Sequence, residues 1–264
     1  MRVLVTGAGS GLGKAMATRF ARAGWRVLVS DVDEAAAESV AKELEASFLR
    51  LDVTDNATWL AALQWCEREW DGLDVLVNNA GVAAGGPFEQ IDLMDWDWIL
   101  NINLKGVVRG CRMFVPLFKK QGSGHLVNVA SLAGFMNLPA MSSYNVTKAG
   151  VISLSETLRH ELAPYGITTT VVCPGYVKTN LGDRIRGTNP AVAKLNQKLM
   201  ETSTVTPEDV AEQVFDAVAR KRFLVLTHKE GRRSTRLKRY LPGLVDREVR
   251  RYWDRFRKVL EGGA

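Results

Sequence analysis

Residues 3–13 read Val-Leu-Val-Thr-Gly-Ala-Gly-Ser-Gly-Leu-Gly, a short apolar run that leads directly into a glycine-rich turn. An apolar run of this length bounded by glycine predicts a buried strand, and the periodic pattern over Leu12–Ala23 predicts a helix. Glycine lets the backbone approach a phosphate group closely, and the helix N-terminus supplies amide donors and the positive end of the helix dipole. The stretch therefore predicts a strand, turn and helix that bind a nucleotide; a turn that serves packing alone is the alternative.

The rest of the chain repeats this alternation of short apolar runs with helical patterns, which predicts βαβ units and a parallel sheet. Strands are expected at Arg2–Thr6, Arg26–Ser30, Ser47–Leu51, Val75–Asn78, Gly124–Ala130, Ile167–Cys173 and Phe223–Leu226. Helices are expected at Leu12–Ala23, Glu34–Glu45, Asn56–Trp70, Asp95–Lys119, Ser142–Ala163 and Pro207–Arg220. We expect an α/β fold with a single doubly wound, Rossmann-like parallel sheet of about seven strands and helices on both faces, with ligands bound at the carboxyl ends of the strands.

The composition is that of an ordinary globular protein, with 46% hydrophobic and 24% charged residues in a chain of 264. We find no signal-peptide pattern and no apolar run near the ~20 residues that a membrane helix needs. Cys66, Cys111 and Cys173 are widely spaced and form no Cys-x-x-Cys pair, so neither a disulfide framework nor a zinc or other metal site is expected. These features favour a cytoplasmic protein.

The spacing of the glycines distinguishes between two nucleotide-binding patterns. The pattern Gly-x-Gly-x-x-Gly fails from Gly7, because position 12 is leucine, whereas Thr-Gly-x-x-x-Gly-x-Gly matches completely from Thr6. Asp31 closes the second predicted strand 20 residues after Gly11. A carboxylate there can accept hydrogen bonds from the adenine-ribose hydroxyls and repels a 2′-phosphate, which favours NAD over NADP. The alternative role for Asp31 is the N-cap of the next helix, a role that Asp33 could fill equally well.

A phenol and an ammonium lie four residues apart, at Tyr144 and Lys148, on one face of a predicted helix. A free phenol has a pKa of about 10, so a nearby cation that stabilises the phenolate prepares it for proton transfer near neutral pH. Ser131 follows the fifth predicted strand and can hydrogen-bond a substrate oxygen. Asn103 lies inside a predicted helix, where asparagine often has a specific hydrogen-bond partner.

Together these residues and the glycine turn resemble the classical short-chain dehydrogenase/reductase family over residues 1 to about 226. The resemblance implies that Tyr144 gives or takes the proton and that Ser131 polarises the carbonyl oxygen. It implies that Lys148 lowers the pKa of the phenol and holds the nicotinamide ribose, and that Asn103 supports a proton relay through water. Hydride transfer at the pro-S face is also implied.

Further segments are similar to family motifs that contact the cofactor. Asn-Asn-Ala-Gly follows the fourth predicted strand, Asp-Val follows the third, and Pro-Gly-Tyr-Val-Lys-Thr follows the sixth. The cofactor residues that the resemblance implies are Gly7, Gly9, Ser10, Gly11, Leu12, Gly13, Asp31, Asp52, Val53, Asn79, Ala80, Gly81, Tyr144, Lys148, Pro174, Gly175, Val177 and Thr179.

The substrate is less well defined. Apolar residues follow the fifth predicted strand, at Leu132, Ala133, Phe135, Met136 and Leu138, and favour an apolar secondary alcohol or ketone. Asn180–Val205, with a helical patch at Ala191–Met200, is interpreted as a lid whose apolar residues Val192, Leu195, Leu199 and Met200 face the substrate or pack on the body. The resemblance implies a homodimer or homotetramer formed through the long helices. A sensor or scaffold protein that binds the cofactor with little catalysis is the alternative.

The C-terminal tail differs from the rest in charge. Residues 221–264 hold 14 Lys/Arg and 5 Asp/Glu, a net charge of +9 in a chain whose net charge is +6. We therefore divide the chain into a catalytic region, 1–230, and a basic helical extension, 231–264, with two amphipathic helices on either side of Pro242-Gly243. Without a recognition motif the charge does not indicate nucleic-acid binding. A peripheral membrane contact, a cover over the substrate cleft, and packing on the subunit or across an interface remain open.

Overall fold

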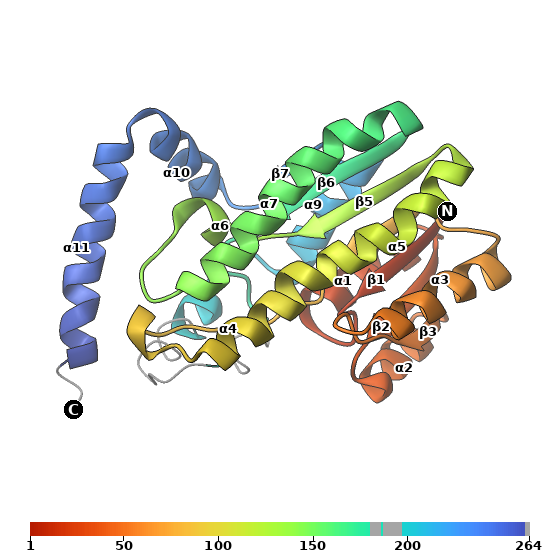
Figure 1. Ribbon diagram of the computed structural model, residues 1–264, viewed down its shortest axis with the longest axis horizontal. Coiled ribbons are helices and arrows are strands. Elements are labelled where there is room, and N and C mark those ends of the chain that lie inside the picture. Colours follow the sequence, from red (N-terminus) through yellow and green to blue (C-terminus); the bar gives the residue numbers. More distant parts are fainter. Residues whose placement is uncertain (180–185, 187–196, 262–264) are drawn as a thin grey trace.

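The computed structural model describes residues 1–179, 186 and 197–261, with side chains as far as residue 258. In this described part of the chain, seven parallel strands form one sheet in the order β3-β2-β1-β4-β5-β6-β7 (Figure 1). The strands are β1 (Arg2–Thr6), β2 (Arg26–Asp31), β3 (Ser47–Arg50), β4 (Val75–Asn78), β5 (Gly124–Val129), β6 (Ile167–Cys173) and β7 (Leu224–Leu226). The predicted doubly wound sheet is confirmed, and the predicted strands differ from the observed ones by one residue at most at either end.

Helices cover both faces of the sheet. They are α1 (Gly11–Arg22), α2 (Glu34–Glu43), α3 (Asn56–Trp70), α4 (Leu93–Leu100), α5 (Gly106–Gln121), α6 (Ala133–Met136), α7 (Ser142–Leu162), α9 (Pro207–Ala219), α10 (Lys229–Tyr240) and α11 (Pro242–Glu261). Short 3-10 turns lie at η1 (Phe88–Gln90) and η3 (Ala163–Tyr165), and a π-helical turn lies at η2 (Asn101–Lys105). Side-chain caps begin several helices, such as Asp33 on α2, Asp55 on α3 and a reciprocal Thr206–Asp209 capping box on α9.

The two faces of the sheet use different apolar residues. Valines such as Val3 and Val5 point to the side covered by α1, α2 and α9, whereas leucines such as Leu4 point to the side covered by α3, α5 and α7. Successive side chains on a strand point to opposite faces, so each strand contributes to both cores. Trp59 is the largest fully buried side chain and anchors α3 in the leucine-rich core.

The single helix predicted over Asp95–Lys119 is divided in the structure. α4 ends at Leu100, the chain widens into the π-helical turn η2, and α5 begins at Gly106. Asn103 lies within η2, and its side chain bonds both backbone groups of Val82. A search for the α-helical period does not distinguish a single π turn from a continuous helix, so the sequence pattern did not indicate this turn. Such π turns are often found at functional sites.

The C-terminal extension forms the two predicted helices. α10 contacts α6 and β7, and α11 contacts α10 at the left edge of the molecule in Figure 1. Lys238 fastens α10 to the body, since its Nζ donates to the carbonyl oxygen of Phe135 at 2.7 Å. Val245 and Phe256 form the buried face of α11. Among the described helices, none has the length and hydrophobicity that crossing a bilayer requires.

Candidate active site

A cleft of about 800 Å³ opens at the carboxyl ends of the strands, between β1 and β4. The chain leaves these two neighbouring strands in opposite directions, and this switch point is where doubly wound sheets bind ligands. All the predicted site residues except Gly9 and Asn103 line the cleft. They are Gly7, Ser10, Gly11, Leu12, Gly13, Asp31, Asp52, Val53, Asn79, Ala80, Gly81, Ser131, Tyr144, Lys148, Pro174, Gly175, Val177 and Thr179.

The glycine turn forms one end of the cleft. Gly7 has a φ of +63°, and a Cβ on Gly13 would overlap the carbonyl oxygen of Gly7, so both positions require glycine. Asn79 holds the turn from the β4 side, because its Nδ2 donates to the carbonyl oxygens of Thr6 at 2.9 Å and Gly7 at 3.1 Å. The Ser10 side chain makes no capping hydrogen bond to α1. The first amides of α1 therefore face the cleft as donors for an anion.

Two acidic residues near this turn have distinct positions. Asp31 Oδ2 accepts from the Gly9 amide at 3.0 Å and Oδ1 accepts from the Asp33 amide at 3.1 Å. Asp33 caps α2 through the Ala36 amide, so the N-cap alternative for Asp31 is wrong. The Asp31 carboxylate lies instead on the wall of the cleft. Gly9 lies behind that wall, where a Cβ would be 2.8 Å from the Cβ of Ala36.

Tyr144 and Lys148 point into the cleft from the first two turns of α7. Lys148 Nζ donates to the carbonyl oxygen of Val129 at 3.0 Å and lies 5.7 Å from the centroid of the Tyr144 ring. Burial raises the pKa of the Tyr144 phenol, and a side-chain hydrogen bond with Ser131 acts in the opposite direction. Burial also lowers the pKa of the Lys148 ammonium to about 8. The three side chains thus form one buried polar cluster.

Asn103 supports this cluster from behind the wall of the cleft. Its side chain is fully buried, with Oδ1 accepting from the Val82 amide and Nδ2 donating to the Val82 carbonyl, both at 2.8 Å. A Cβ added to Gly81 would lie 3.2 Å from Asn103 Oδ1 and 3.5 Å from Lys148 Nζ, so these two polar atoms border the same small space. Asn103 therefore lies near Lys148 but does not line the cleft.

The substrate side of the cleft differs in part from the prediction. Leu132, Ala133, Met136 and Leu138 line the cleft, but Phe135 does not, because its ring packs against the leucine-rich core. The predictions for Val192 and Leu195 lie outside the described residues. Residues 197–201 are helical, and Met200 lines the cleft. Val82, Trp98 and Met141 are apolar residues that also line the cleft, and no sequence motif indicated them.

His228, just after β7, is a supporting residue that no sequence motif indicated. Its Nδ1 accepts from the Gly175 amide at 3.1 Å, and its Nε2 lies 2.9 Å from the carbonyl oxygen of Tyr176. Because Nδ1 is an acceptor, the neutral ring carries its proton on Nε2 and donates to Tyr176. The imidazole therefore fixes the loop that follows β6.

We expect His228→Ala to weaken cofactor binding, because the loop after β6 loses both backbone contacts. Each neutral hydrogen bond contributes about 0.5–1.5 kcal/mol, so the dissociation constant should rise by about tenfold. Fluorescence titration with reduced cofactor measures this change. His160→Ala, at an exposed position on α7, is the control and should bind as wild type does. If wild type, His228→Ala and His160→Ala bound the reduced cofactor with equal affinity, His228 would not position this loop.

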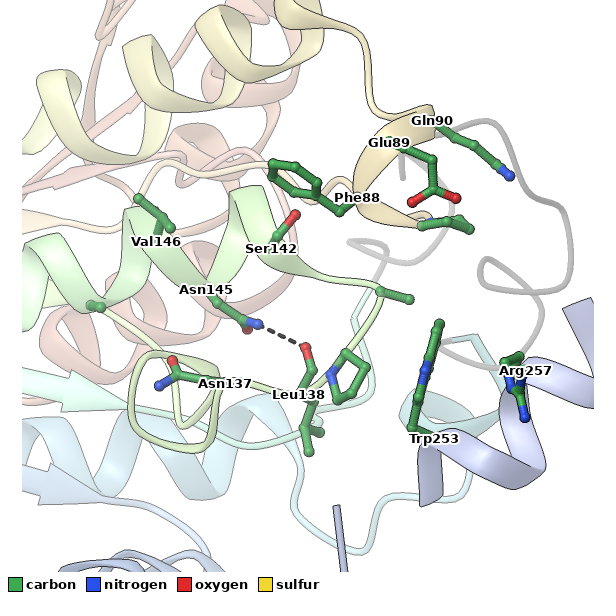
Figure 2. Close-up of a pocket in the computed structure, with 14 residues that line it drawn as sticks. Phe88, Glu89, Gln90, Asn137, Leu138, Ser142, Asn145, Val146, Trp253 and Arg257 are labelled. Carbon is green, nitrogen blue, oxygen red and sulfur yellow. Dashed lines mark hydrogen bonds between the residues drawn. The ribbon is translucent and has the colours of Figure 1, made fainter. Parts of the chain in front are cut away.

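A second cavity of about 830 Å³ lies on the other side of the first turns of α7 (Figure 2). Ser142, Asn145 and Ala149 line it, whereas Tyr144 and Lys148 on the opposite helix face line the cleft. Asn145 Nδ2 donates to the carbonyl oxygen of Leu138 at 2.8 Å, the dashed line in Figure 2. Trp253 of α11 faces this loop across the cavity.

The comparisons with known proteins agree with this geometry. The family model described as short chain dehydrogenase matches residues 1–190. The chain is 35% identical over 234 residues to the probable oxidoreductase EphD of Mycobacterium tuberculosis. That alignment covers 83% of this chain but only 40% of EphD, which is a longer protein. It is 34% identical over 224 residues to the 3-oxoacyl-[acyl-carrier-protein] reductase FabG of Thermotoga maritima, covering 80% of this chain and 87% of that one.

Among solved structures, a short chain dehydrogenase/reductase from Burkholderia phymatum in complex with NAD aligns with a TM-score of 0.87 and 32% identity. The alignment covers 92% of this chain and 94% of that chain. The likeness therefore includes most of the sheet, the cleft and its surrounding helices. The chain is a member of the short-chain dehydrogenase/reductase family of oxidoreductases.

Proposed function

We propose that this oxidoreductase transfers a hydride between a nicotinamide cofactor and a secondary alcohol or ketone, with Tyr144 as the proton-transferring residue. The observation that carries the proposal is one cleft that holds a phosphate-binding turn at one end and the Tyr144, Ser131 and Lys148 cluster farther along. A dinucleotide needs the glycine turn for its phosphates, and carbonyl chemistry needs the cluster for proton transfer and for hydrogen bonding to the reacting oxygen.

The residues of the cleft match the chemistry of the cofactor. The open amides of α1 and the glycines around them would hold the pyrophosphate, and Asp31 would accept from the adenine-ribose hydroxyls. We propose that Asp52 and Val53 border the adenine, that Asn79, Ala80 and Gly81 line the adenosine ribose, and that Lys148 binds the nicotinamide ribose. The loop residues Pro174, Gly175, Val177 and Thr179 would contact the nicotinamide amide and the phosphate. The Asp31 carboxylate on the wall of the cleft favours NAD over NADP, since it repels a 2′-phosphate.

The reaction follows from these positions. When bound, the nicotinamide ring supplies the carbon that accepts or donates the hydride. In alcohol oxidation, the Tyr144 phenolate takes the hydroxyl proton as the alcohol carbon loses its hydride, and in ketone reduction the phenol returns that proton to the oxygen. Ser131 hydrogen-bonds the same oxygen as its charge changes. Lys148 stabilises the phenolate, and Asn103 holds the wall through which a water-mediated proton relay reaches solvent.

Ketone reduction should slow in alkaline solution. The reaction requires Lys148 in its cationic form, and burial lowers the pKa of this ammonium to about 8, so the cation is lost as pH rises through that value. The pKa of Tyr144 is raised, so its phenol stays protonated over the same range. We expect kcat/KM for reduction to be flat near pH 7 and to fall by about tenfold per pH unit above about pH 8. A profile measured at constant ionic strength tests this, and a rate that rises through this range would contradict the assignment.

The substrate that we propose is apolar. Val82, Trp98 and Met141 join the predicted apolar residues, including Met200, in the lining of the cleft. We further propose a cytoplasmic homodimer or homotetramer that acts on a small molecule and not on nucleic acid. Exposed apolar side chains on α4 and α7, including Leu93, Met94 and Val146, support association of copies.

An assay of reduced-nicotinamide absorbance, with NAD and NADP in parallel, tests the proposal across steroids, aliphatic secondary alcohols, 3-hydroxyacyl thioesters and polyols. Turnover with NAD and an apolar alcohol is the expected result. Turnover with NADP alone would overturn the role of Asp31. Cofactor binding without turnover on any of these substrates would favour the alternative of a cofactor-binding sensor or scaffold protein.

A further inference from the structure

The turn between α10 and α11 exposes a cluster of apolar side chains. Tyr240 is 73% exposed, Leu241 is 52% exposed and Leu244 is 43% exposed, and Pro242 and Gly243 between them are exposed as well. These residues do not serve the packing of the hairpin, because Val245 and Phe256 form the buried face of α11. We call residues 240–244 the hairpin tip. In Figure 1 the tip lies at the upper left corner of the molecule, away from the sheet.

Positive charge surrounds the hairpin tip. Residues 229–258, the described side chains of the hairpin, include 12 Lys/Arg and 4 Asp/Glu, a net charge of +8. Arg236, Arg239 and Arg247 flank the tip at exposed positions, and none of them forms an ion pair within the described part of the chain. Exposed apolar residues with exposed arginines on the adjoining helices match the two layers of a membrane surface, in which anionic headgroups cover an apolar interior.

The hairpin is attached beside the entrance to the cleft. Lys238 bonds the carbonyl oxygen of Phe135 in α6, and a Cβ on Gly231 would lie 3.1 Å from the Leu132 side chain. Leu132 and Met136, at either end of α6, line the apolar part of the cleft. A surface bound by the hairpin tip would therefore lie on the substrate side of the molecule.

We propose that the hairpin tip is a peripheral membrane contact, in which Tyr240, Leu241 and Leu244 enter the headgroup region of an anionic bilayer and the arginines of α10 and α11 bind the lipid phosphates and carboxylates. This contact does not depend on the proposed activity. It places the apolar end of the cleft near a lipid phase in which apolar alcohols and ketones dissolve. Nucleic acid fits the charge of the hairpin but not its exposed apolar tip.

Flotation of the full chain with phosphatidylcholine vesicles, with and without phosphatidylserine, tests the proposal. We expect binding only with phosphatidylserine, binding that weakens as salt is added, and a partition coefficient about tenfold lower for Leu241→Ser. Leu60→Ser is the matched control, because Leu60 on α3 is 46% exposed and lies outside the hairpin. Both substitutions are at exposed positions, and circular dichroism confirms that each variant is folded.

The other outcomes would overturn the proposal. Wild-type protein that floats with neither vesicle, or a Leu241→Ser variant that binds as the Leu60→Ser control does, would exclude the tip as a membrane contact. Binding of a short DNA duplex in preference to phosphatidylserine vesicles, unchanged by Leu241→Ser, would identify the hairpin as a nucleic-acid surface. A change in oligomeric state by light scattering, without a change in flotation, would identify it as an interface between copies of this chain.

Discussion

Replacing Tyr144 with phenylalanine should lower kcat for alcohol oxidation by about a thousandfold or more and leave the dissociation constant of the cofactor unchanged. Phenylalanine fills the same buried space but carries no hydroxyl, so the proton of the substrate has no acceptor that is positioned beside Ser131. The loss should appear in kcat because proton transfer occurs in the chemical step and not in cofactor binding.

A matched control comes from the same cleft. Tyr176 also lines it, so Tyr176→Phe removes a phenolic hydroxyl from the same cleft but leaves Tyr144 in place. We expect this control to retain kcat within about tenfold of wild type, since it removes at most a positioning contact. Steady-state rates and cofactor titrations of the two variants make the comparison. Turnover by Tyr144→Phe at the wild-type rate would place the proton-transferring group elsewhere.

Replacing Asp31 with serine should make NADP a usable cofactor. Each like-charge contact between this carboxylate and a 2′-phosphate costs about 1 kcal/mol in water and about 4 kcal/mol at an effective dielectric constant of 20. We therefore expect the ratio of kcat/KM for NADP to that for NAD to rise by about a hundredfold. The variant also loses the hydrogen bond from the Gly9 amide, so its KM for NAD should rise as well.

Asp33→Ser is the control for this change. It removes a carboxylate only two residues away, but one that caps α2. Serine is itself a good N-cap residue, so the variant should keep its stability and show the same ratio of kcat/KM for the two cofactors as wild type. If Asp31→Ser left the NADP to NAD ratio unchanged, or if Asp33→Ser altered it equally, the cofactor preference would have another source.

The fold could be predicted because its signals are local and repeated. The central strands are apolar runs buried on both faces, and several helices begin at a side-chain cap, so the seven parallel strands could be predicted from the pattern. The π-helical turn at Asn103 was missed, because a search for the α-helical period does not distinguish a single π turn from a continuous helix.

The cleft could be predicted because its residues follow the carboxyl ends of the strands in a recognisable spacing. Three features needed the structure itself. Phe135 packs against the leucine-rich core, although Leu132 and Met136 on either side of it line the cleft. His228 has no motif, because its role depends on backbone groups more than 50 residues away. The division of α7 between two cavities depends on how α11 packs, and a helical pattern alone does not indicate its neighbour.

Direct hydride transfer is the central claim, and an isotope measurement tests it. Reduced NAD with deuterium at the pro-S position of nicotinamide C4 is incubated with a series of apolar ketones, and the alcohols formed are examined by mass spectrometry. We predict that wild-type protein places one deuterium on the carbinol carbon and that Tyr144→Phe forms almost no labelled alcohol. Protein that binds the reduced cofactor tightly and yields no alcohol, labelled or unlabelled, from any ketone would contradict the account and favour a cofactor-binding sensor or scaffold.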